Sequence, residues 1–260
     1  YNDDTIAWYE NDGTSDPRWT ASDIDTNADG AMSVFAADMD GDGDMDIVSA
    51  SAEDDTIAWY ENDGAANPRW VADDITTSAG GAHGVFVADM DNDGDMDIVL
   101  ASYLDNTIAW YENDGASNPD WTAADIATDA NGAMSVFAAD MDGDGDMDIL
   151  SASKTDDTVA WYENDGASDP SWTASDIDTN ADYAESVFAA DIDNDGDMDI
   201  VSASAEDDTI AWYENNGVSN PSWAASDIAT SADYATSVFA ADMAGYYTHL
   251  QAHETHEHIE

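Results

Sequence analysis

The sequence predicts an all-β fold, organised as a five-bladed propeller of four-stranded repeats. The nine-residue stretch that begins at Asp38, Asp-Met-Asp-Gly-Asp-Gly-Asp-Met-Asp, returns almost unchanged at Asp89, Asp140 and Asp191, so the chain repeats every 51 residues. Each repeat also contains short alternating runs of β-branched and aromatic residues, separated by Gly, Pro and Asn-Asp pairs. Such runs are typical of antiparallel strands. Four strands in a repeat of about 40–50 residues form the blade of a β-propeller.

One repeat can be followed from Ser33 to Ile75. Its first strand is expected over residues 33–37, just before the Asp-rich loop, and its second over residues 46–51, just after it. A polar turn then leads to a third strand over residues 56–61. Asn62-Asp63-Gly64 is a turn signal, and a loop containing Pro68 leads to a fourth short strand that starts near Trp70.

The repeat extends over nearly the whole chain, because every Trp, Phe and Pro residue recurs at the 51-residue spacing. We therefore expect a single propeller over residues 1–245 and a non-repeat, His-rich tail over residues 246–260. The chain opens at a third strand (residues 5–10) and ends with a fifth copy of the first strand (Ser237 to Asp242). Closure of the fifth blade by both termini would hide the sheet edges, with residues 246–252 supplying the missing second strand. The alternative is an open or swapped assembly in which half-blades pair between chains.

The charge of the chain is extremely acidic, with 60 Asp and Glu residues against three Lys and Arg residues and a formal net charge of −57. Such a surface repels nucleic acid and anionic lipid and attracts cations. No apolar run approaches the length of a membrane span, and the absence of Cys excludes disulfides. We expect no nucleic-acid partner, no membrane insertion and a surface adapted to high salt.

The Asp-rich loops have the composition of calcium sites. Alternate carboxylates converge around a glycine that permits a sharp turn, the fourth Asp offers its backbone carbonyl, and the fifth closes the cage. Hard oxygen ligands in this number suit calcium better than the smaller and stricter magnesium ion. The sequence thus predicts four Ca²⁺ sites, formed by Asp38, Asp40, Asp42, Asp44 and Asp46; Asp89, Asp91, Asp93, Asp95 and Asp97; Asp140, Asp142, Asp144, Asp146 and Asp148; and Asp191, Asp193, Asp195, Asp197 and Asp199.

Two other interpretations of these loops are weaker. An EF-hand needs a bidentate Glu at the twelfth loop position, where this chain has Ser49, Leu100, Ser151 and Ser202. A plain acidic hairpin turn does not explain four copies with five carboxylates each. The fifth copy, Asp242-Met243-Ala244, retains only the first carboxylate, and we expect no calcium there. The His residues of the tail do not form a zincin motif, and we assign them no metal site.

The loop motif Asp-x-Asp-x-Asp-Gly-Asp-x-Asp, followed by Ile-Val or Ile-Leu, together with the segment Ala-Trp-Tyr-Glu-Asn-Asp-Gly, resembles the FG-GAP/VCBS repeats of integrin-α-type propellers. The resemblance runs from about Tyr1 to Met243. It implies a β-propeller with calcium in the loops between the first two strands of each blade. It also implies an extracellular or cell-surface protein that serves adhesion or ligand binding, in some members as a lectin. The Phe-Gly and Gly-Ala-Pro motifs of the family are replaced here by Val-Phe-Ala-Ala-Asp.

Two sets of tryptophans are candidates for packing and for ligand binding. Trp59 and its copies are expected to pack between blades. The second set follows the proline loop and is expected at more exposed positions between blades. An aromatic face beside carboxylate and amide groups suits a sugar ring, and five weak equivalent sites would give avidity. The candidate ligand-binding residues are Trp19, Trp70, Trp121, Trp172 and Trp223.

The uniform repeat favours a binding module over an enzyme, because catalytic residues usually break symmetry. His83 is the only His outside the tail, and no Cys or Gly-x-Ser-x-Gly motif is present. We predict an extracellular calcium-binding propeller that acts as an adhesion or ligand-binding module, for instance a multivalent lectin, with a carbohydrate or protein ligand. The alternatives are a calcium-rigidified or self-assembling scaffold and a polysaccharide-active enzyme. A closed ring predicts a monomer.

Overall fold

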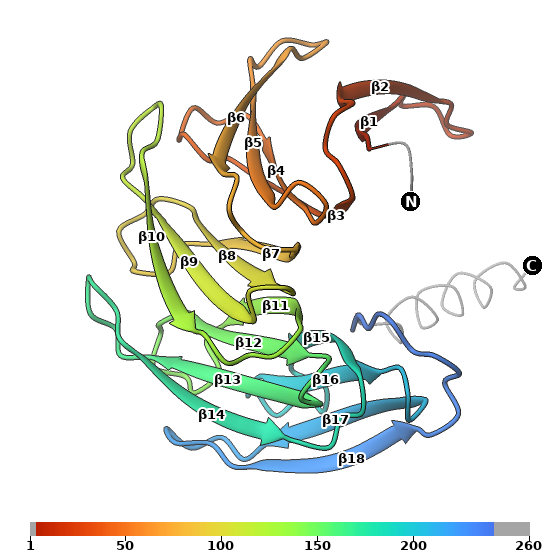
Figure 1. Cartoon of the computed structure of the whole chain (residues 1–260), viewed down its shortest axis with the longest axis vertical. Helices are drawn as coiled ribbons and strands as arrows, with labels where there is room; N and C mark the ends of the chain where they lie inside the picture. The colour runs from red at the N-terminus through yellow and green to blue at the C-terminus, as the bar shows by residue number, and fades with distance from the viewer. Residues whose placement is uncertain (1–3, 242–260) are drawn as a thin grey trace, which may run out of the picture.

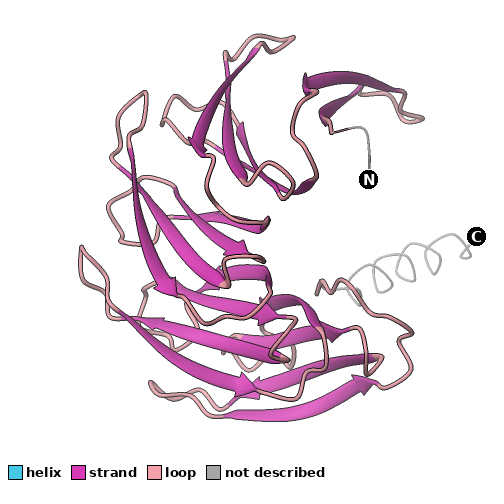
Figure 2. Cartoon of the chain, in the orientation of Figure 1, coloured by secondary structure: helices cyan, strands magenta, loops and turns pink. Residues whose placement is uncertain are grey.

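The computed structural model describes residues 4–241, where all the helical or sheet structure is β-strand. Its strands form one two-stranded and four four-stranded antiparallel sheets. Figures 1 and 2 show these sheets arranged as blades around a common centre, in an arc that is open between the N-terminal sheet and the last residues described. Within residues 4–241 there is no helix long and apolar enough to span a bilayer.

The five sheets follow one another in chain order. The N-terminal sheet has two strands, β1 (Ile6–Asn11) and β2 (Trp19–Asp25). The others are β3 (Ala31–Ala37), β4 (Asp46–Ser51), β5 (Thr56–Asn62) and β6 (Trp70–Thr76); β7 (Ala82–Ala88), β8 (Asp97–Ser102), β9 (Thr107–Asn113) and β10 (Trp121–Ala127); β11 (Ala133–Ala139), β12 (Asp148–Ser153), β13 (Thr158–Asn164) and β14 (Trp172–Asp178); and β15 (Ala184–Ala190), β16 (Asp199–Ser204), β17 (Thr209–Asn215) and β18 (Trp223–Ala229).

Each four-stranded sheet is a meander in which neighbours in sequence are neighbours in space. The first strands (β3, β7, β11 and β15) lie nearest the centre and the fourth strands lie outside (Figure 1). The turn between the second and third strands contains a residue at positive φ, such as Asp55 at +57°, a conformation that Asp and Asn tolerate better than other residues. The predicted strand order within the repeat is confirmed.

The core lies between successive sheets rather than within one central layer. Val48 and Trp59 of the β3–β6 sheet pack in one cluster with Ile98 and Leu100 of the next sheet. Trp59 is 2% exposed, and its copies Trp110 and Trp161 are similarly buried. Burial of one such side chain stabilises the fold by about 1.5–3 kcal/mol. The interpretation of Trp59 as a packing residue between blades is confirmed.

The predicted closing strand is not formed over its described residues, since residues 237–241 have no strand structure. This segment nevertheless occupies the place of a fifth innermost strand. The Val238 N–H donates to Ser186 Oγ at 3.3 Å, as Val187 N–H does to Ser135 Oγ one repeat earlier. The Phe239 ring lies 4.8 Å from that of Phe188.

A strand needs a partner to complete its backbone hydrogen bonds, and the second strand expected for this blade falls in residues 246–252, outside the described residues. Within residues 4–241, the β1–β2 sheet likewise gains no third strand. The sheets are therefore propeller-like blades, and closure into a five-bladed ring stays a prediction.

Candidate metal centres

All four Asp-rich loops connect the first and second strands of a four-stranded sheet, for example β3 to β4. They emerge at the same end of equivalent strands, so they lie on one face of the arc. The sharpest turn of each loop is at a glycine with strongly positive φ, from +96° at Gly43 to +104° at Gly196. A side chain is strained in that conformation, which explains why glycine recurs there. Two residues earlier, Asn92 and Asn194 replace glycine at φ of about +60°, which Asn accepts.

The first three carboxylates of each loop converge. One carboxylate oxygen from each of Asp38, Asp40 and Asp42 lies within 4.8 Å of the other two. The equivalent Asp residues of the other three loops converge in the same way. Backbone groups orient them: the Gly43 N–H donates to Asp38 Oδ2 at 3.0 Å and the Asp42 N–H to Asp40 Oδ1 at 3.2 Å. The three oxygen donors are therefore brought together before any cation arrives.

Two observations show that this donor set fits a hard divalent cation. Asp38 Oδ1 is buried and has no hydrogen-bond partner in the part of the chain described, which is costly for a carboxylate oxygen unless a cation or donor meets it. Burial, with the like charges of Asp42 and Asp38 added, raises the pKa of Asp40 above its usual range. The equivalent pKa values of Asp91, Asp142 and Asp193 are raised for the same reasons.

The last two carboxylates of each predicted set lie outside these triads. Asp46 is only 1% exposed, and its oxygens accept the backbone N–H groups of Met39 at 3.1 Å and Asn62 at 2.8 Å. Burial raises the pKa of its copies Asp97 and Asp148 to about 7. This residue fixes the loop to the sheet whether or not it also reaches a cation.

The carboxylate of Asp44 is turned toward Gly64, where a Cβ atom would overlap it. Asp95, Asp146 and Asp197 occupy the same position against Gly115, Gly166 and Gly217. A metal-binding role for this residue therefore falls to its backbone carbonyl, as the sequence predicts, and this role stays a prediction. The degenerate fifth loop at Asp242 and the His-rich tail both lie outside the described residues.

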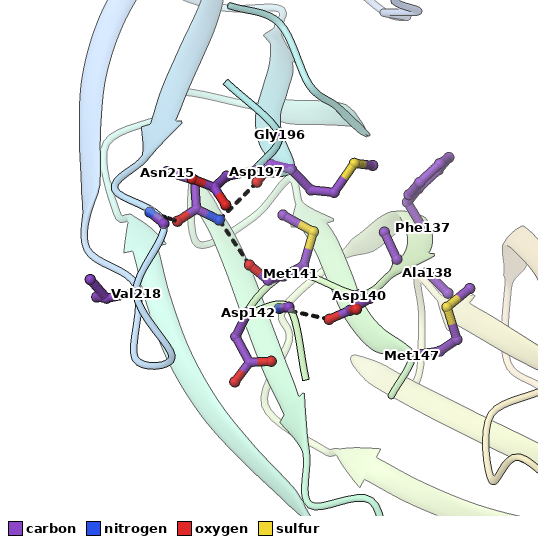
Figure 3. A pocket seen from close by; sticks show the side chains of 14 residues that line it. Phe137, Ala138, Asp140, Met141, Asp142, Met147, Gly196, Asp197, Asn215 and Val218 are labelled. Atoms are coloured by element: carbon purple, nitrogen blue, oxygen red, sulfur yellow. Dashed lines mark hydrogen bonds between the residues drawn. The ribbon is translucent and has the colours of Figure 1, made fainter. Parts of the chain in front are cut away.

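Sequence reasoning missed a buried asparagine that joins neighbouring loops. Asn215 is 3% exposed, and its Nδ2 donates at 2.8 Å to the Met141 carbonyl of the preceding loop and at 3.0 Å to the Met198 carbonyl of its own loop (Figure 3). Asn113 and Asn164 form the same bridges. The signal was the periodic Asn of Glu-Asn-Asp-Gly, which we interpreted as a turn residue alone. Each bridge places an amide between two candidate metal centres.

The second tryptophan set stands at the seams between sheets. Four tryptophans that each begin an outermost strand are half-buried: Trp70, Trp121, Trp172 and Trp223. Trp19, against which no preceding sheet packs within residues 4–241, is 60% exposed. The rings of Trp172 and Trp223 pack edge-on against Trp110 and Trp161 of the preceding sheet.

A cavity of about 600 Å³ opens at one of these seams, where Trp121 and Tyr111 lie beside Asp105, Asp125 and Thr107. Aromatic and acidic side chains are thus brought together as expected.

The fold has solved relatives at low sequence identity. The Aleuria aurantia fucose-specific lectin superimposes with a TM-score of 0.53 at 14% identity, over 89% of this chain and 72% of the lectin. The Vibrio cholerae biofilm matrix protein Bap1 (TM-score 0.52, 19% identity) is matched over 90% of this chain and 36% of its own, so the chain spans about a third of it. The periplasmic gluconolactonase PpgL of Pseudomonas aeruginosa superimposes with a TM-score of 0.52 at 14% identity, over 87% of this chain and 67% of PpgL. These matches support a propeller-like fold alone.

No curated protein sequence matches the chain. A family profile described as the FG-GAP-like repeat, in contrast, matches five times, over residues 1–49, 39–100, 89–151, 141–202 and 193–245. These matches cover nearly the whole chain and coincide with the repeats that carry the Asp loops. The chain belongs to the FG-GAP-like repeat family.

Proposed function

We propose that this chain is an extracellular, calcium-binding five-bladed propeller that acts as a ligand-binding or adhesion module. The observation that carries the proposal is the fourfold convergence of three carboxylates within 4.8 Å. Like charges at this distance repel one another unless a cation binds between them. Calcium takes six to eight oxygen ligands, and backbone carbonyls, the fifth Asp and water would complete each shell.

Isothermal titration of the metal-free chain with calcium tests this proposal. We expect about four sites, and a matched titration with magnesium should give much weaker binding because magnesium is reluctant to lose its water. Heat changes that are absent, or equal for the two ions, contradict the calcium assignment.

A carbohydrate is the ligand that the seams favour. The cavity at Trp121 combines two aromatic rings with two carboxylates and several Ser and Thr hydroxyls, and its volume lies within the usual range for small-molecule sites. A sugar presents an apolar C–H face to the ring and hydroxyl groups to the carboxylates. The resemblance of the fold to a fucose-specific lectin is compatible with this ligand class and does not identify it.

A glycan array in calcium, repeated with EDTA, tests the lectin proposal. The variant Trp121→Ala with Trp172→Ala and Trp223→Ala should lose binding without unfolding. Phe137→Leu is the control, because the Phe137 ring of the innermost strand β11 contacts Phe86 and Phe188 rather than a seam tryptophan. If the triple variant keeps full binding, the seam tryptophans are not the sugar sites.

The open arc favours a second candidate, a scaffold that assembles through its half-blades. The β1–β2 sheet and the segment 237–241 each lack strand partners among the described residues, and unpaired edges invite association. Sedimentation velocity at several concentrations separates the two: a closed ring stays monomeric, whereas half-blade exchange increases mass with concentration. A screen against marine polysaccharides and lactones tests the expectation that the module is not an enzyme.

A further inference from the structure

A second type of cavity lies at the opposite end of the innermost strands from the Asp loops. It has a volume of about 460 Å³. Because β3 runs from Ala31 toward the loop that follows Ala37, residues at the start of this strand and its copies face away from the candidate metal centres. One position of the repeat supplies most of the lining, with all five of its copies meeting there: Met32, His83, Met134, Glu185 and Thr236.

The lining positions are ones at which the repeats differ. Two and three residues further along the strand, Val and Phe are identical in all five copies, yet the lining position changes from Met to His, Met, Glu and Thr. Tyr103 and Lys154, which also line the cavity, replace the Ala52 and Ala205 of other repeats. Packing alone would favour the same residue in every copy, since the strands are equivalent. Chemically different side chains from equivalent positions therefore meet around this cavity.

Two tyrosines at this end are held in an unfavourable backbone conformation. Tyr183 has φ of +62° and Tyr234 has φ of +53°, where the other three repeats have Gly30, Gly81 and Gly132. A tyrosine at positive φ is rare, and residues of this kind cluster at functional sites. Tyr234 lines the cavity and is 56% exposed. The Tyr183 ring lies 4.7 Å from the Lys154 Nζ.

The polar groups of the cavity form a mixed set of donors and acceptors. Lys154, the only lysine of the chain, donates to Glu185 Oε1 at 2.6 Å, which leaves two ammonium N–H groups and a carboxylate oxygen for other partners. His83 Nδ1 lies 2.8 Å from the Met134 carbonyl, so Nδ1 carries the proton and Nε2 is an acceptor. Burial lowers the pKa of His83, which keeps the imidazole neutral at neutral pH.

We propose that this axial cavity is a single, non-repeated binding site for a neutral sugar or polyol of one or two rings. Hydroxyl groups both donate and accept, so they match the Lys154–Glu185 pair and the imidazole together. The apolar C–H face of a ring packs against Tyr103 and Tyr234.

Ionic ligands match the cavity less well. The Lys–Glu pair has no net charge to offer an ion, and the net charge of −57 repels anions. Among the described residues, Glu185 is the only carboxylate that lines the cavity, and one carboxylate is too few for a hard metal ion. The site differs from the seam sites in residues, face and number, so it does not depend on them.

The test is ligand-observed NMR on the full calcium-loaded chain with glucose, galactose, mannose, fucose, N-acetylglucosamine, glycerol and β-linked disaccharides of these sugars, followed by calorimetry on the best binder. We expect one equivalent bound per chain. The triple variant His83→Met, Lys154→Ala, Glu185→Met installs residues that this chain already tolerates at equivalent positions, so it should fold. It should weaken binding about tenfold or more, the usual effect of removing a charged hydrogen-bond partner.

Two further variants separate this site from the seams. Arg69→Ser, which copies an outer-loop residue of other repeats, should bind normally, and Tyr234→Gly should weaken binding while retaining the melting temperature of the wild type. Trp121→Ala should still bind one equivalent of the sugar per chain. The proposal is overturned if no member of the panel binds saturably, or if the triple variant binds with unchanged affinity. Multivalent glycan binding that only the Trp variants abolish would support the seam sites and not this one.

Discussion

Neutralising one candidate metal centre should have opposite effects on stability with and without calcium. In the double variant Asp140→Asn, Asp142→Asn, two of three carboxylates within 4.8 Å lose their charge, which removes all three repulsive pairs. One such pair costs about 0.9 kcal/mol at the dielectric constant of water and about 3.5 kcal/mol at an effective value of about 20. Because Asp144 is exposed, the lower value applies. The metal-free variant should therefore be more stable than the metal-free wild type by about 1–3 kcal/mol.

In calcium the order should reverse. A site that is filled at a thousandfold excess over its Kd stabilises the fold by about 4.1 kcal/mol, and the variant lacks one of the four. After the relieved repulsion is subtracted, the wild type should be more stable by about 1–3 kcal/mol, which corresponds to about 2–12 °C in Tm for a chain of this size. Calorimetry in EDTA and in calcium measures both effects, with the exposed pair Asp73→Asn, Asp74→Asn as a control of equal charge change. If the variant is the less stable protein in both buffers, or if calcium leaves the wild-type Tm unchanged, the loops are not calcium sites held apart by carboxylate repulsion.

Four further outcomes are expected. Asn164→Ala should lower the free energy of unfolding by about 1–3 kcal/mol, because buried carbonyls lose their donor. Asn62→Ala, whose amide contacts only the Met45 carbonyl of its own loop among the described residues, should cost less in the same urea titration. Leu100→Ala should cost about 2–5 kcal/mol, whereas Leu104→Ala, at a position 65% exposed, should be nearly neutral. The folded-state pKa of His83 is lowered, so its contribution to the free energy of unfolding is complete above about pH 6.5 and is lost as the pH falls toward the folded-state pKa. In scans from about pH 8 to about pH 5, the Tm should therefore fall more steeply for the wild type than for His83→Met. Sodium chloride should raise Tm, because it screens the net charge of −57, and a Tm that is independent of salt would contradict that expectation.

The strands and the metal triads were predictable because their determinants are local. Asp38, Asp40 and Asp42 are two residues apart around a glycine, so the loop alone brings them together. The third strand is likewise indicated by its own alternation, and the structure extends it by one residue, to Asn62.

What was missed depends on how one sheet is placed against the next. Asn164 donates to Met90, 74 residues earlier in the chain, and Lys154 meets Glu185 from a neighbouring sheet. The Asn recurs in every repeat, but the pattern does not name its partner, and Lys154 and Glu185 each occur at their position in only one repeat. The closing strand is not formed over residues 237–241 for a related reason. Ser237 and its neighbours repeat the pattern of a first strand, but no second strand pairs with them within the described residues.

The near-identity of the blades has a consequence for how the chain reaches its native state. Strands β5, β9 and β17 have the same sequence, Thr-Ile-Ala-Trp-Tyr-Glu-Asn, and β4 and β16 are also identical. Side chains therefore do not distinguish the correct strand pair from one shifted by a whole repeat. Connection length does: replacing a turn of about four residues by a loop of about fifty-five costs about 2 kcal/mol of closure entropy. The short turns therefore direct each strand to pair within its own blade. At high protein concentration another chain offers the same strands, so refolding under that condition should produce wrong strand pairs between chains.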